Sequence, residues 1–130
     1  MSPPPRRPLI LASGSARRRT ILARMGVPFE VLVPDVAEVL HPADARRTAL
    51  ENAALKSAWC RARHPDRHSL AADTLIEFRG RTVTKARTRD EAVAFLRMFS
   101  GTTHTVFTAV ALACPGAEPD LVLDAAEVRF

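Results

Sequence analysis

A short apolar run, a turn of small residues and consecutive arginines follow one another in LILASGSARRRTILARMG, residues 9–26. The run Leu9–Leu11, ended by Ala12–Ser15, is typical of a buried strand that enters a tight turn. Ser15 can cap a helix whose first turn carries Arg17 and Arg18, and a glycine closes the segment. The pattern therefore predicts a strand, a turn and a helix that opens with positive charge.

Two interpretations of these arginines stay open on the residues alone. A helix N-terminus exposes unpaired backbone N–H groups at the positive end of the helix dipole, and Arg17 and Arg18 would add paired donors for phosphate oxygens. Alternatively, the arginines form a solvated basic face. Positive charge is unfavourable near a helix N-terminus, and this placement indicates a compensating anion.

Length and composition predict one folded domain. The chain has 130 residues, of which 47% are hydrophobic and 25% charged, a balance typical of folded proteins. Residues 1–8 contain prolines and arginines without the apolar core of a secretory signal, which predicts a flexible lead-in to a domain at 9–130. No apolar run approaches the roughly 18 residues of a membrane helix, so we expect no membrane partner. Cys60 and Cys114 match no metal or disulfide motif, which predicts free thiols in the cytoplasm.

The formal charge of +5 suits nucleic acid, nucleotide phosphates or simple solubility. The sequence has no tyrosine and one tryptophan, so a platform on which bases stack is poorly supported. Nucleic-acid binding is therefore the less favoured alternative.

Strand-like and helix-like segments alternate along the rest of the chain. A long helix is expected between two prolines, and a capping box at Thr88–Glu91 begins another. The expected strands cover residues 28–34 at a sheet edge, 69–72, a hairpin at 75–83, 104–114 and 121–130, and the expected helices cover 43–63 and 88–100.

Several charged residues are candidates for chemistry, each with a plainer alternative. Asp73 follows the strand at 69–72, where a strand of an open α/β sheet would end, but it could equally form a turn. Asp35 and Glu38 could join it around a divalent cation, although acids in loops are usually solvated. Lys56 shares a helix face with small residues, and Lys85 follows the hairpin. Both lysines could bind phosphate or simply extend toward solvent.

The order of these segments resembles a known family. LILASGSARRRTIL, PFEVLVPDVAE, ENAALKSA, AADT, TK and SGTTHTVFTAV resemble, in order and spacing, the Maf family of septum formation inhibitor-like nucleoside triphosphate pyrophosphatases. The resemblance covers residues 9–130. It implies an α/β fold in which a mixed, twisted sheet has flanking helices, like that of the inosine triphosphate pyrophosphatases. It also implies a hydrolase of nucleotide metabolism that needs a divalent metal such as Mg or Mn.

The resemblance also assigns roles to residues. Asp73 matches the catalytic acid that activates water, and Glu38 together with Asp73 is implied to hold the metal. Thr74 and the segment Thr108–Val110 resemble the corresponding residues of the family branch that acts on dTTP and UTP. The 7-methyl-GTP branch usually has glutamine at the position of Thr74. The residues implied to bind substrate or phosphate are Ser13, Arg17, Arg18, Lys56, Thr74 and Lys85.

Three departures from the family pattern carry expectations. Ala16 stands where the family usually has proline, and Thr84–Ala86 replaces glycine-lysine-proline, so these loops should be less rigid. Family members continue past Phe130 into a Gly-Tyr-x-Ile-Gln-Gly-like segment, so the domain is expected to be incomplete at its C-terminus, with reduced activity. Relatives are often dimeric, which implies a possible homodimer. The alternative to an enzyme is a non-catalytic nucleotide- or nucleic-acid-binding remnant of this fold.

Overall fold

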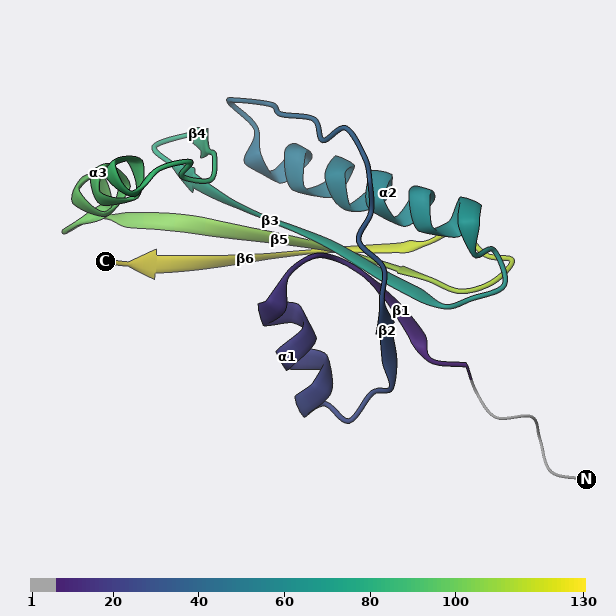
Figure 1. The fold of residues 1–130 in the computed structure, drawn as a ribbon. Coiled ribbons are helices and arrows are strands. Elements are labelled where there is room, and N and C mark those ends of the chain that lie inside the picture. Colours follow the sequence, from purple (N-terminus) through teal and green to yellow (C-terminus); the bar gives the residue numbers. More distant parts are fainter. Residues whose placement is uncertain (1–6) are drawn as a thin grey trace, which may run out of the picture.

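Six strands form one mixed sheet in the computed structural model, which describes residues 7–130 (Figure 1). The sheet order is β2 (Phe29–Val31), β1 (Leu9–Ala12), β3 (Ser69–Phe78), β5 (Thr103–Ala113) and β6 (Asp120–Arg129), with β4 (Arg81–Val83) also paired to β3. β1 is parallel to β2 and β3, whereas β3 pairs antiparallel with β4 and β5, and β5 pairs antiparallel with β6.

Helices lie on both faces of the sheet. α1 (Ala16–Arg24) and α2 (Ala45–Arg63) lie on opposite sides of it (Figure 1). α3 (Arg89–Phe99) lies near the C-terminal end of β3 and the N-terminal end of β5 (Figure 1). The predicted mixed sheet with flanking helices is therefore confirmed. None of the three helices within residues 7–130 is long and apolar enough to cross a membrane.

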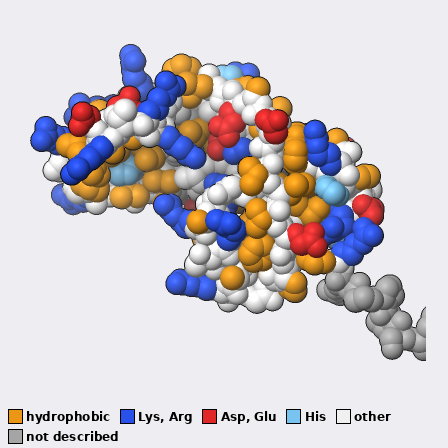
Figure 2. All heavy atoms as spheres, in the orientation of Figure 1, with side chains coloured by type: hydrophobic (Ala, Val, Ile, Leu, Met, Phe, Trp, Pro, Cys, Tyr) orange, Lys and Arg blue, Asp and Glu red, His pale blue; other side chains and the backbone are white. Residues whose placement is uncertain are grey.

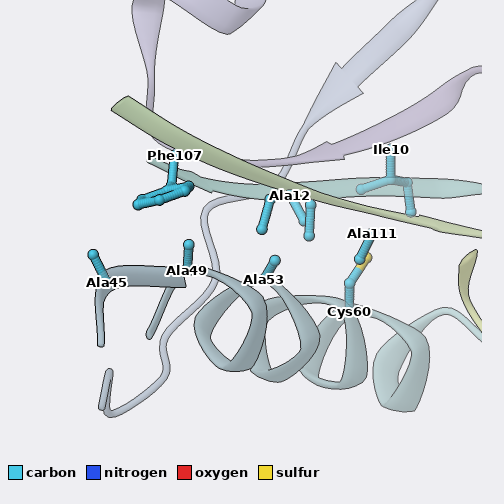
Figure 3. Close-up of a cluster of buried hydrophobic side chains, with 10 residues drawn as sticks. Ile10, Ala12, Ala45, Ala49, Ala53, Cys60, Phe107 and Ala111 are labelled. Carbon is cyan, nitrogen blue, oxygen red and sulfur yellow. The ribbon is translucent and has the colours of Figure 1, made fainter. Parts of the chain in front are cut away.

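Small side chains bring α2 close to the sheet. Ala49, Ala53 and Cys60 are fully buried, and they recur at the spacing that places residues on one helix face. They point toward Ala12, Phe107 and Ala111 of the sheet (Figure 3). Because alanine adds little bulk, the helix backbone approaches the strands closely. The short polar side chains of this helix face can therefore reach the sheet.

The local signals of the sequence are confirmed. Ser15 accepts a hydrogen bond from the Arg18 backbone N–H and begins α1, and Thr88 does the same for Glu91 and begins α3. A hairpin joins β3 to β4 at Arg79 and Gly80, both with positive φ. Cys60 and Cys114 are free thiols. Of the expected lead-in at 1–8, residues 1–6 lie outside the described part of the chain.

Two strand predictions need correction. The strand at 69–72 does not end before Asp73, since β5 pairs with Ser69–Glu77 and supplies backbone hydrogen bonds well past that point. Asp73 therefore lies in the middle of β3. The strand expected at 28–34 forms only at Phe29–Val31, where β1 offers a partner, although it lies at the sheet edge as predicted.

Candidate active site at the open edge of strand β3

One edge of β3 is only partly covered by neighbouring strands. β5 pairs along nearly the whole of the opposite edge, so β1 and β4 share this one. The pairing with β1 stops at Ala71, and the pairing with β4 begins at Ile76. Within the described chain, residues 72–75 have no strand partner on this edge. Asp73 and Thr74 lie in that open interval, close to the end of β1.

Arg18 anchors the site on the α1 face of the sheet. Its Nη1 donates to Ser13 Oγ at 2.9 Å, and its Nη2 donates to Thr74 Oγ1 at 3.1 Å. Ser13 is only 3% exposed and also accepts the Ser15 backbone N–H at 3.1 Å. The hydroxyls of Thr74 and Thr108 hydrogen-bond at 3.3 Å. The turn after β1, the start of α1 and the middle of β3 therefore meet at one guanidinium.

The charge of Arg18 is not neutralised by a contacting carboxylate. Burial lowers the pKa of its guanidinium, the charge of Asp73 raises it and the charge of Arg17 lowers it. An arginine nevertheless keeps its proton at neutral pH. Among residues 7–130, no ion pair joins Arg18 to an acid, and the first turn of α1 contains no acidic residue. Lys and Arg side chains gather around this end of α1 (Figure 2). The site is therefore electropositive and suited to an anion.

Asp73 belongs to a second cluster on the α2 face. Successive side chains of a strand alternate between faces, so Asp73 and Thr74 point in opposite directions. Asp73 is 8% exposed. Its Oδ1 accepts from Lys56 Nζ at 3.3 Å, and its Oδ2 accepts from Asn52 Nδ2 at 3.2 Å. Lys56 Nζ also lies 2.9 Å from Glu38 Oε1. Two carboxylates therefore converge on one ammonium group.

The structure brings together most, but not all, of the predicted site residues. Ser13, Arg18 and Thr74 form one cluster, and Glu38, Lys56 and Asp73 form the other. Arg17 is exposed beside the first cluster. Lys85 is exposed between β4 and α3, and no hydrogen bond or ion pair in the described region joins it to either cluster. Asp35 is likewise exposed on its loop.

Sequence reasoning missed Asn52. This residue is 2% exposed and stands four positions before Lys56, a spacing that places both on the same face of α2. A polar residue on an otherwise alanine-rich, sheet-facing helix side is a signal that could have identified it. His104 lies outside both clusters and is packed with its ring 4.6 Å from the Phe99 ring.

Known proteins resemble this chain over most of its length. A profile of Maf-like proteins matches residues 8–130. A dTTP/UTP pyrophosphatase of Deinococcus radiodurans is 44% identical over 110 residues, which are 85% of this chain and 56% of the relative. One from Xanthomonas euvesicatoria is 42% identical over 128 residues, covering 94% of this chain and 67% of the relative. The chain thus spans about half to two thirds of these relatives.

Solved structures show the same fold. The Staphylococcus aureus Ham1 protein superposes with a TM-score of 0.64 at 16% identity, covering 95% of this chain and 71% of that one. A nucleoside-triphosphatase, dITP/XTP pyrophosphatase from Mycobacterium abscessus gives a TM-score of 0.58 at 19% identity, with 93% and 73% covered. At such identities the likeness concerns the fold alone, and it confirms the expected architecture. The match across residues 8–130 and the relatives above 40% identity show that the chain belongs to the Maf family.

Proposed function

We propose that this chain forms the catalytic part of a nucleoside triphosphate pyrophosphatase that hydrolyses dTTP and UTP to the monophosphate and pyrophosphate. The names of the Deinococcus and Xanthomonas relatives support the reaction and the substrates. The arrangement at the open edge of β3 supports it independently, because it combines the positive charge of Arg18 at the start of α1 with the buried carboxylate of Asp73.

One observation carries the proposal. Arg18 is a partly buried cation whose side-chain hydrogen bonds go to two hydroxyls, those of Ser13 and Thr74, at the N-terminus of a helix. A buried charge without a counter-ion is costly. A triphosphate bound at this edge offsets that cost, because its oxygens accept from the guanidinium and from the free backbone N–H groups of α1.

The two clusters divide the reaction between them. A substrate lying across the open edge contacts Arg18 on one side and the Asp73 cluster on the other. Asp73 takes a proton from a water molecule whose oxygen attacks the α-phosphorus. The bond from that phosphorus to the oxygen bridging to the β-phosphate breaks, and pyrophosphate leaves. Arg18 stabilises the charge that develops on the phosphate oxygens.

The carboxylates of Glu38 and Asp73 fit a divalent cation. They already converge on the ammonium of Lys56, and hard cations prefer carboxylate oxygens. Within residues 7–130, no group of three or more acidic, histidine or cysteine side chains gathers as a metal site. This suits Mg²⁺, which is commonly held by one or two carboxylates and by the substrate's phosphates. Such an ion supplies Lewis-acid charge stabilisation and a more acidic water when bound.

The test is pyrophosphate release from dTTP, UTP and CTP by the purified chain, with Mg²⁺ or Mn²⁺ and with a chelator. We expect metal-dependent release from dTTP and UTP in preference to CTP. Asp73→Asn should keep nucleotide binding and lose most turnover, because it preserves the shape but removes the base. If the wild-type chain binds nucleotide and releases no pyrophosphate, the proposal is wrong and the chain is a non-catalytic binding remnant.

A further inference from the structure

The Asn52 side chain links the carboxylate of Asp73 to the chain segment that carries Glu38. Residues 32–44, called the strap here, run from β2 to α2 and carry Glu38. The Asn52 Oδ1 accepts the Val39 backbone N–H at 2.8 Å, and its Nδ2 donates to the Val39 carbonyl oxygen at 3.0 Å. The same Nδ2 donates to Asp73 Oδ2 at 3.2 Å. One buried amide therefore fixes the strap beside Glu38 and also holds Asp73.

These contacts set how the carboxylates face each other. Asp73 Oδ2 faces Asn52, which leaves Oδ1 on the side of Lys56 and Glu38. Glu38 is itself 54% exposed at its side chain, so burial does not fix its position. Its neighbour Val39 is fixed instead, by the double hydrogen bond to Asn52. If that amide is lost, Asp73 can rotate and the strap segment that carries Glu38 is released.

We propose that Asn52 is a positioning residue that holds Glu38 and Asp73 in the relative orientation that turnover requires. This inference rests on the proposed function for its catalytic consequence. Asn52 acts through Asp73 and the strap, and it contacts Asp73 Oδ2, whereas Lys56 contacts Oδ1.

Thr48 provides a matched control on the same helix. It lies one turn before Asn52 and also fixes the strap, because its Oγ1 accepts the His41 backbone N–H at 2.9 Å and contacts the His41 carbonyl at 3.3 Å. It is 1% exposed, as buried as Asn52. It makes no hydrogen bond to Asp73. Removing Thr48 therefore loosens the strap but leaves the carboxylate of Asp73 held.

The first experiment compares Asn52→Ala with Thr48→Ala in the full chain, by measuring kcat and KM for dTTP and the thermal unfolding midpoint. We expect both variants to unfold at lower temperature. Asn52→Ala should lower kcat by about 10–100-fold, the usual effect of removing a partner of a ligating group, while KM changes little. Thr48→Ala should keep most of kcat. Equal losses of kcat in the two variants would overturn the inference. Asn52→Leu, which fills the space, replaces Asn52→Ala if that variant does not fold.

A second measurement does not depend on activity. Urea unfolding of Asn52→Ala, Asp73→Ala and the double variant should show coupling of about tenfold in the unfolding equilibrium constant, or about 1.4 kcal/mol. The corresponding cycle of Thr48→Ala with Asp73→Ala should be additive. Additive effects of Asn52 and Asp73 would contradict the inference even if the enzyme is active. If the wild-type chain is inactive but Asn52 and Asp73 are coupled in unfolding, the proposed function is refuted. The conclusion that Asn52 positions Asp73 then still stands.

Discussion

Replacing Arg18 with alanine should separate nucleotide binding from folding. The change removes the donors to Ser13 and Thr74, at 2.9 and 3.1 Å. Both hydroxyls keep a partner, because Ser13 Oγ still accepts the Ser15 N–H and Thr74 still contacts Thr108. No buried polar group is left unsatisfied, and a partly buried charge disappears. We therefore expect the free energy of unfolding to change by no more than about 1 kcal/mol.

Binding should respond much more strongly. A hydrogen bond from a charged donor contributes about 1.5–3 kcal/mol, and Arg18 is partly buried, whereas Arg17 and Arg19 beside it on α1 are exposed. The dissociation constant should therefore rise about 10- to 150-fold. Arg18→Lys should give an intermediate loss, because it keeps the charge but not the planar pair of donors.

The assay is calorimetry with a dTTP analogue whose α–β bridging oxygen is replaced by carbon, so that it binds without being cleaved. Arg19→Ala is the control, because Arg19 lies on the same helix with an exposed side chain. It should change affinity only slightly, through long-range charge, and that change should vanish at high salt. Unchanged affinity in Arg18→Ala, or equal losses in both variants, would refute the phosphate site at α1.

Three further predictions concern packing, thiol chemistry and assembly. Ala53 is fully buried between α2 and the sheet, so Ala53→Leu should overpack this contact and lower the free energy of unfolding by about 1–3 kcal/mol. An unchanged midpoint of urea unfolding would contradict the close approach of this helix. Burial raises the pKa of the Cys60 thiol, so less of the reactive thiolate forms at a given pH. A disulfide reagent should therefore modify exposed Cys114 rapidly and Cys60 only when the protein opens, and Cys114→Ser should remove the fast phase. Leu121 and Val122 are 47% and 60% exposed on edge strand β6, so we expect a homodimer or concentration-dependent association in light scattering; a monodisperse monomer at high concentration would contradict this.

The parts of this fold that could be predicted from sequence are those whose causes are local. Ser15 and Thr88 cap their helices through side chains only three residues from the N–H groups they accept, so short motifs suffice to find them. The hairpin at Gly80 likewise depends on residues adjacent in sequence. These features follow from the chain regardless of what packs against it.

The length of β3 and the surroundings of Asp73 depend on distant segments. Ala109 is the register partner of Asp73, and nothing near residue 73 indicates that a strand so far along the chain will extend β3. The family motifs pointed to Glu38 and Asp73 as a pair. That Lys56 lies between them follows from how α2 and the strap fold onto the sheet. Such contacts are tertiary, and they have no local signature.

The open edge of β3 explains why two residues adjacent in sequence can serve opposite faces of one site. Strand alternation directs Asp73 toward α2 and Thr74 toward α1, so each face receives one group from the same strand. A neighbouring strand alongside residues 72–75 would separate the two faces completely. Because β1 ends at Ala12 and β4 pairs only from Ile76 onward, a ligand at this edge can contact both faces. The early end of β1 also places the positive start of α1 at that edge, where the proposed function requires phosphates to bind. The short β1 therefore matters to the site as much as any charged residue does, and lengthening its pairing with β3 should close the site without altering a single functional side chain.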